Sequence, residues 1–141
     1  MNIVVDANIY VSAAINPGGL AERALTGTID AGHALHVSAL ILQEVRRAFL
    51  RDNVRVRRRF DTTRVEQLMG DLNESVVDDD YPLPETLGLR DSSGAHLVRL
   101  ALVCHADLIV SADKDLLTLG SIEGIPVVDI HAFAYTLGLR H

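Results

Sequence analysis

The sequence has very little cysteine and no long hydrophobic run. Cys104 is its only cysteine, so an internal disulfide is excluded and a reducing, cytoplasmic location is expected. No apolar stretch approaches the length that crosses a bilayer, so we expect no membrane partner. Zinc-type spacings of Cys and His, internal repeats and low-complexity linkers are also missing from the sequence. Because a strand is expected at Ile3–Val5, the chain leaves no room for a signal peptide.

The composition is typical of a folded domain. Apolar residues make up 48% of the 141 residues and charged residues 23%, an ordinary balance for a globular protein. A chain of this length normally forms one domain and buries a substantial core. We therefore expect a single domain over residues 1–141.

Positive charge is concentrated in one segment of an otherwise acidic chain. The formal net charge is −6, although arginines crowd a short central stretch. This asymmetry has two interpretations: a basic face for an anionic partner beside an acidic site, or a solvated arginine-rich helix without a partner. The arginines of this segment are Arg46, Arg47, Arg51, Arg55, Arg57, Arg58, Arg59 and Arg64.

Strand and helix patterns alternate along the chain. Short apolar or β-branched runs predict strands at Ile3–Val5, Leu35–Ser38, Val76–Val77, Ala106–Ala112 and Pro126–Asp129. The stretches between and after them predict helices at 9–15, 20–31, 38–51, 54–73, 91–104 and 131–137. Such alternation favours right-handed crossovers and a parallel sheet. The predicted fold class is α/β, with three α/β/α layers around a central parallel sheet.

Two acids stand at the ends of predicted buried strands. Asp6 follows Ile3–Val5 directly, and Asp113 follows Ala106–Ala112. The carboxyl ends of parallel strands meet at one edge of the sheet, where open α/β sheets place their ligands. If the two strands are neighbours, the two carboxylates converge. The alternative is that Asp6 only caps the helix that follows, since Asp is a preferred N-cap residue.

Two further acids, Glu44 and Asp91, join Asp6 and Asp113 as candidate site residues. At about 100° per residue, Glu44 falls inside the apolar arc of the helix that Ser38 caps. An inward glutamate is costly unless it is paired or binds a cation; the alternative is a boundary glutamate that meets an arginine. Asp91 stands at another helix start. Carboxylates grouped in this way repel one another, and oxygen ligands suit Mg²⁺ or Mn²⁺. Such a site supports phosphodiester hydrolysis.

The sequence resembles the PIN domain family, within it the VapC-like ribonucleases that are toxin components of toxin–antitoxin systems. The resemblance rests on Val4–Asn8 with Ser12, on Val37 through Glu44, and on Ala106–Leu117. It implies a ribonuclease that depends on Mg²⁺ or Mn²⁺, often a homodimer, and often bound by an antitoxin protein. The residues that match the motif are Asp6, Glu44 and Asp113, with Asn8, Ser12 and Asp115 in support.

One position departs from the family pattern. In the family, the helix before the last acid-bearing strand usually starts with an aspartate that binds metal. Gly94 occupies the matching position here, whereas Asp91 lies about one helical turn earlier on roughly the same side. Two outcomes stay open: Asp91 reaches the metal directly or through water, or the site is weakened.

Three functions compete at this point. The first is an RNA-cleaving nuclease, in which Arg55, Arg57, Arg58 and Arg59 contact RNA phosphates. The second is a PIN-fold module that has lost catalysis and binds RNA or protein, which Gly94 favours. The third is a phosphatase with a D-x-D motif after the first strand. Asn8 stands where that motif needs its second aspartate.

Overall fold

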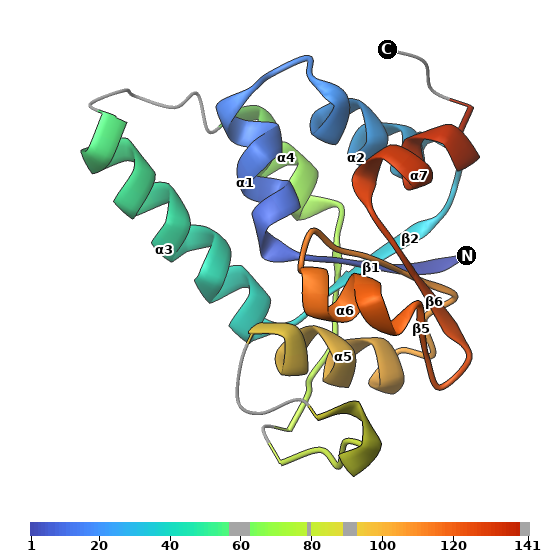
Figure 1. Cartoon of the computed structure of the whole chain (residues 1–141). Coiled ribbons are helices and arrows are strands. Elements are labelled where there is room, and N and C mark those ends of the chain that lie inside the picture. Colours follow the sequence, from blue (N-terminus) through green and yellow to red (C-terminus); the bar gives the residue numbers. More distant parts are fainter. Residues whose placement is uncertain (57–62, 79, 89–92, 139–141) are drawn as a thin grey trace.

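A sheet of short strands forms the centre of the molecule (Figure 1). The computed structural model describes residues 1–56, 63–78, 80–88 and 93–138. The strands are β1 (Asn2–Val5), β2 (Ala34–Val37), β3 (Asn73–Glu74), β4 (Leu108–Val110), β5 (Ser121–Ile122) and β6 (Ile125–Val128). They lie in the order β3-β2-β1-β4-β6-β5. All pairs are parallel except β5 with β6, which are antiparallel.

Helices cover both faces of this sheet. They are α1 (Ala7–Ile15), α2 (Leu20–Asp30), α3 (Ala39–Val56), α4 (Thr63–Gly70), α5 (Ser93–Val103), α6 (Lys114–Leu119) and α7 (Ile130–Thr136), with a short 3₁₀ helix η1 (Glu85–Leu87). In Figure 1, α1, α2, α4 and α7 lie above the sheet, and α5 and α6 lie below it. The predicted three-layer α/β/α architecture is therefore confirmed.

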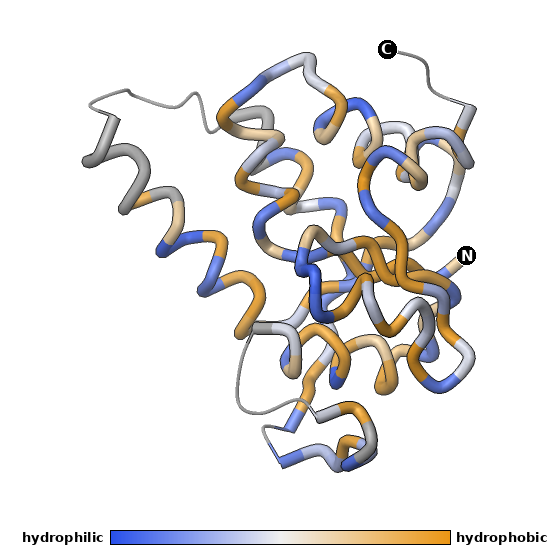
Figure 2. Tube along the Cα trace, viewed as in Figure 1, coloured by the Kyte–Doolittle hydropathy of each residue, from blue (hydrophilic) through white to orange (hydrophobic). Residues whose placement is uncertain are grey.

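The central strands are buried on both faces, as their β-branched runs predict. Ile3, Val4 and Val5 have no exposed surface, and neither does Ile109 on β4. The hydropathy view shows the apolar strands crossing the middle of the molecule, with hydrophilic residues concentrated on outer helices and loops (Figure 2). None of the helices in the described ranges combines the length and the apolar character needed to cross a bilayer.

The structure corrects the sequence prediction at several elements. The strand predicted at Val76–Val77 is wrong, because β3 lies at Asn73–Glu74, where His36 and Val37 of β2 pair with it. The two-residue edge strand β5 was not predicted, so the sheet is mixed rather than fully parallel. Helix α3 continues to Val56, beyond the predicted end near Arg51. The helix predicted at 54–73 is therefore wrong at both ends, because its first residues belong to α3, α4 ends at Gly70, and Asn73 belongs to β3. These differences lie away from β1 and β4, which position the candidate site.

Candidate active site

Asp6 and Asp113 are joined through one serine hydroxyl at the carboxyl edge of β1 and β4. These strands are neighbours, with Val5 in register with Val110. The Ser111 hydroxyl donates to Asp6 Oδ2 at 2.9 Å, and Ser111 Oγ accepts from the Asp113 backbone N–H at 3.0 Å. Ser111 is fully buried, whereas both aspartates are half-buried. The hydroxyl therefore fixes the Asp6 carboxylate relative to the turn that carries Asp113.

Each of these aspartates also caps a helix. Asp6 Oδ1 accepts from the Asn8 backbone N–H at 3.3 Å at the start of α1, and Asp113 Oδ1 accepts from the Asp115 N–H at 2.9 Å at the start of α6. The capping interpretation is thus correct, but it does not account for Ser111. A cap needs one side-chain oxygen, and Asp6 uses its second oxygen toward Ser111. Asp6 therefore caps α1 with one oxygen and binds the Ser111 hydroxyl with the other.

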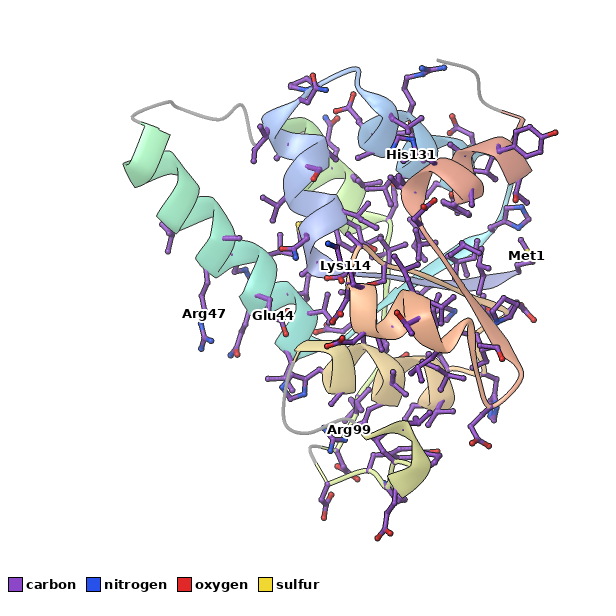
Figure 3. All side chains as sticks on the ribbon, viewed as in Figure 1. Met1, Glu44, Arg47, Arg99, Lys114 and His131 are labelled. Atoms are coloured by element: carbon purple, nitrogen blue, oxygen red, sulfur yellow. The ribbon has the colours of Figure 1, made fainter. Side chains whose placement is uncertain are left out.

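Glu44 lies half-buried on the first half of α3, beside the same edge of the sheet (Figure 3). Burial raises the pKa of Glu44; the negative charge of Asp6 raises it further, while His96 and Arg47 lower it. A carboxylate that is partly desolvated and near another acid gains more from a cation than an exposed one does. Figure 3 shows Arg47 pointing away from the sheet, although its charge still lowers the pKa of Glu44.

Two residues of the site were missed by the sequence analysis. His96 lies on α5, which packs against α3, and its charge acts on Glu44. Its Nδ1 is buried and has no hydrogen-bond partner within the described residues. Ser111 is the other missed residue. The signal available for both was a polar residue inside a nearly continuous apolar run, since buried polar groups normally have a specific partner.

The supporting residues expected from the resemblance lie around the two aspartates. Asn8, Ser12 and Asp115 are all exposed. Ser12 donates its hydroxyl to the Asn8 backbone carbonyl at 3.0 Å, which places both on the same side of α1. Asp115 enters the site through its backbone N–H, which binds Asp113. Asn8, Ser12 and Asp115 thus follow the two aspartates on α1 and α6, and none of their three side chains makes a hydrogen bond to Asp6 within the described residues.

Several of the predicted site residues lie in or beside segments outside the described residues. Asp91, Arg57, Arg58 and Arg59 lie outside the described residues, and Arg55 is described only as part of α3. Gly94, in contrast, is a buried residue in the first turn of α5. The position that the family fills with an aspartate is therefore enclosed by protein in this chain.

The donor atoms of the site suit a hard divalent cation. Asp6, Glu44 and Asp113 offer carboxylate oxygens, the ligands that Mg²⁺ and Mn²⁺ prefer. Burial is the main cause of the raised pKa of Glu44, and the charges of His96 and Arg47 offset only part of that rise. Within residues 1–56, 63–78, 80–88 and 93–138, however, no three Asp, Glu, His or Cys side chains are grouped closely enough to hold a metal ion. The carboxylate ligands are therefore of the right type for such a cation, but the described residues do not supply a complete set of ligands.

Comparisons with known proteins agree with this fold. The sequence profile of the PIN domain matches residues 2–115. The solved structure of PAE2754 from Pyrobaculum aerophilum is similar with a TM-score of 0.64 and 17% identity, covering 98% of each chain. VapBC2 from Rickettsia felis, solved with a DNA fragment from its promoter, has a chain that is similar with a TM-score of 0.65 and 12% identity, covering 92% of this chain and 98% of that one. No curated protein matches the sequence.

Proposed function

Because this chain belongs to the PIN domain family, we propose that it is a nuclease that cleaves RNA phosphodiester bonds with a bound divalent cation, Mg²⁺ or Mn²⁺. One observation carries the proposal most. Asp6 and Asp113 stand at adjacent strand ends, joined through Ser111, while Glu44 lies close enough for Asp6 to raise its pKa. Grouped acids of this kind are costly unless they share a cation.

The residues of the chain would divide the work as follows. Asp6, Glu44 and Asp113 would hold the cation, with Asp91 as the candidate fourth ligand. When bound, the cation polarises the phosphate and supplies an activated water. Ser111 keeps Asp6 in one orientation, because its single proton is donated to that carboxylate. His96 lowers the pKa of Glu44 and so opposes the effect of Asp6 on it.

We also propose that the protein is the toxin of a toxin–antitoxin pair and forms a homodimer. Support comes from the fold of the VapBC2 complex, in which a chain of the same architecture is solved with its partner and promoter DNA. The sequence resemblance to VapC-like ribonucleases points in the same direction. On this basis the natural partners are an RNA substrate, an antitoxin protein and a second copy of the chain.

The direct test compares RNA with a small phosphomonoester as substrates. We expect the purified protein to fragment a fluorescent RNA in Mn²⁺, to stop when EDTA is added, and to leave p-nitrophenyl phosphate intact. Hydrolysis of the phosphomonoester would instead support the phosphatase. RNA that is bound but stays intact in Mn²⁺ and in Mg²⁺ would contradict the nuclease.

The arginine segment gives a separate prediction about substrate binding. Replacing Arg55, Arg57, Arg58 and Arg59 by Ser removes four positive charges. If all four contact RNA phosphates, the slope of log affinity against log salt falls by about three, at roughly 0.7 per phosphate contact for single strands. Fluorescence anisotropy over a salt series, recorded in EDTA, measures this slope. Arg23→Ser on α2 is the control and should leave the slope nearly unchanged.

The second candidate is a PIN-fold module that binds RNA or protein without cleaving RNA. It is favoured by Gly94, buried at the position of a family metal ligand, and by the incomplete set of ligands within the described part of the chain. The same RNA assay separates it from the nuclease, because binding without fragmentation is its expected result. The arginine variants would lower RNA affinity under either function.

A further inference from the structure

A cavity of about 360 Å³ lies at the carboxyl edge of the sheet, on the side where α3 carries Glu44. Three segments line it: the first turn of α3, the chain that follows β3, and one side of α5. His96 belongs to this lining and also acts electrostatically on Glu44, so it connects the cavity to the acids. Leu40, another lining residue, lies one helical turn before Glu44 on the same side of α3.

Hydrogen bonds fix the walls of this cavity. The Ser75 backbone N–H donates to the Val37 carbonyl at 2.8 Å, which holds the chain after β3 against the end of β2. Farther along, Arg99 Nε donates to the Tyr81 carbonyl at 3.0 Å, so α5 holds the next part of that segment (Figure 3). The volume is near the lower end of the range for small-ligand sites, roughly 300–1,000 Å³. It therefore suits one nucleotide unit rather than an oligonucleotide.

The lining combines apolar surface and two carboxylates with Arg99, whose Nε already donates to the Tyr81 carbonyl. Leu40 and Val76 offer apolar surface, and Val76 is 92% exposed, so its side chain is accessible to a ligand. Glu74 and Asp78 are exposed carboxylates that repel phosphate but accept hydrogen bonds from the amino group of a base. The His96 imidazole adds a flat ring of the kind on which unstacked RNA bases stack.

We propose that this cavity holds one unstacked base with an exocyclic amino group, which means adenine, guanine or cytosine rather than uracil. The base belongs to a nucleotide next to the bond that is cleaved, so the inference rests on the proposed ribonuclease function. The cavity then sets a sequence preference, since the acids themselves contact only phosphate and metal.

Binding in EDTA tests the proposal without requiring cleavage. Short fluorescein-labelled RNAs consist of uridine alone or of uridine with a single central cytidine, adenosine or guanosine. We expect wild type to bind the amino-bearing RNAs about tenfold more tightly than oligouridine, the size of one good base contact. The double variant Ala39→Leu/Ser75→Leu fills the cavity and should lose this preference. Glu74→Ala/Asp78→Ala removes the acceptor oxygens, so it should lose the preference too while binding oligouridine at least as tightly as wild type.

Ala132→Leu is the matched control, because Ala132 is an exposed alanine in the first turn of α7, away from the cavity. It should retain the full preference. Equal affinity of wild type for all four RNAs, binding to none of them, or a preference that survives cavity filling would overturn the proposal. RNA cleavage without base preference refutes the cavity assignment alone, whereas base preference without cleavage refutes the nuclease alone.

Discussion

The Asp6→Asn variant is expected to lose both its stabilisation by Mn²⁺ and its RNA cleavage. A cation that binds only the folded state at a hundredfold excess over Kd adds about 2.7 kcal/mol to the free energy of unfolding. For a chain of this size that is a rise of several degrees in Tm, at roughly 2–4 °C per kcal/mol. Because the cation supplies several kcal/mol of transition-state stabilisation, cleavage should fall by about a hundredfold or more.

The substitution removes the charge of Asp6 and keeps its cap. Asn is as good an N-cap residue as Asp, so α1 should still form. Asp129→Asn is the matched control: Asp129 also follows a strand of the sheet and caps α7 by accepting from the Ala132 N–H at 2.8 Å. Thermal melts with and without Mn²⁺ measure the first effect, and fluorescent RNA the second. Equal Mn²⁺ shifts for wild type, Asp6→Asn and Asp129→Asn would falsify the cation site.

The second large effect is expected from Gly94→Asp, which should raise cleavage by about tenfold or more. Tenfold corresponds to roughly 1.4 kcal/mol of barrier, a modest share of what an added metal ligand can supply. Gly94 lies in the first turn of α5, where a negative charge is favourable to the helix and an aspartate needs no unusual backbone angles. The position is buried, so in EDTA the new carboxylate should lower the Tm. Mn²⁺ should restore it.

Gly94→Asn introduces a side chain of the same size as aspartate but without its charge. It therefore separates the effect of the carboxylate from the effect of side-chain size. It should lower the Tm to a similar degree, gain nothing from Mn²⁺ and leave cleavage weak. Asp91 is tested in the same series: if it is the substitute ligand, Asp91→Asn abolishes wild-type cleavage and is tolerated beside Gly94→Asp. A fully active wild type that neither Gly94→Asp nor Asp91→Asn changes would show that this helix start has no part in the site.

The parts of the fold that could be predicted from sequence are those with strong local signals. β1 and β4 are continuous apolar runs that end in polar residues, and the sheet buries them on both faces. β3 shows the limit of such signals. Val76 and Val77 have the higher β propensity, yet Asn73 and Glu74 form the strand because they meet His36 and Val37 of β2. Hydrogen-bond pairing with β2 therefore determines where β3 lies, and such pairing cannot be read from the local sequence.

The candidate site likewise contains residues that the sequence predicts and residues that it does not. Asp6 and Asp113 follow from strand ends, and the inward position of Glu44 follows from helical periodicity. Ser111 and His96 matter only through neighbours that lie far away in the sequence. Ser111 is buried beside Asp6 because β1 and β4 are adjacent, and His96 reaches Glu44 because α5 packs on α3. Neither adjacency can be obtained from the periodicity of a single element.

The bond between Ser111 and Asp6 joins residues that are 105 positions apart in the chain. During synthesis Asp6 emerges well before its partner strand β4. Closing so long a loop is entropically costly and slow compared with forming the helices between. A nascent or truncated chain that ends before β4 therefore cannot form the link between Asp6 and Asp113. The order of strands in the sheet thus makes the link between Asp6 and the turn that carries Asp113 depend on the arrival of β4.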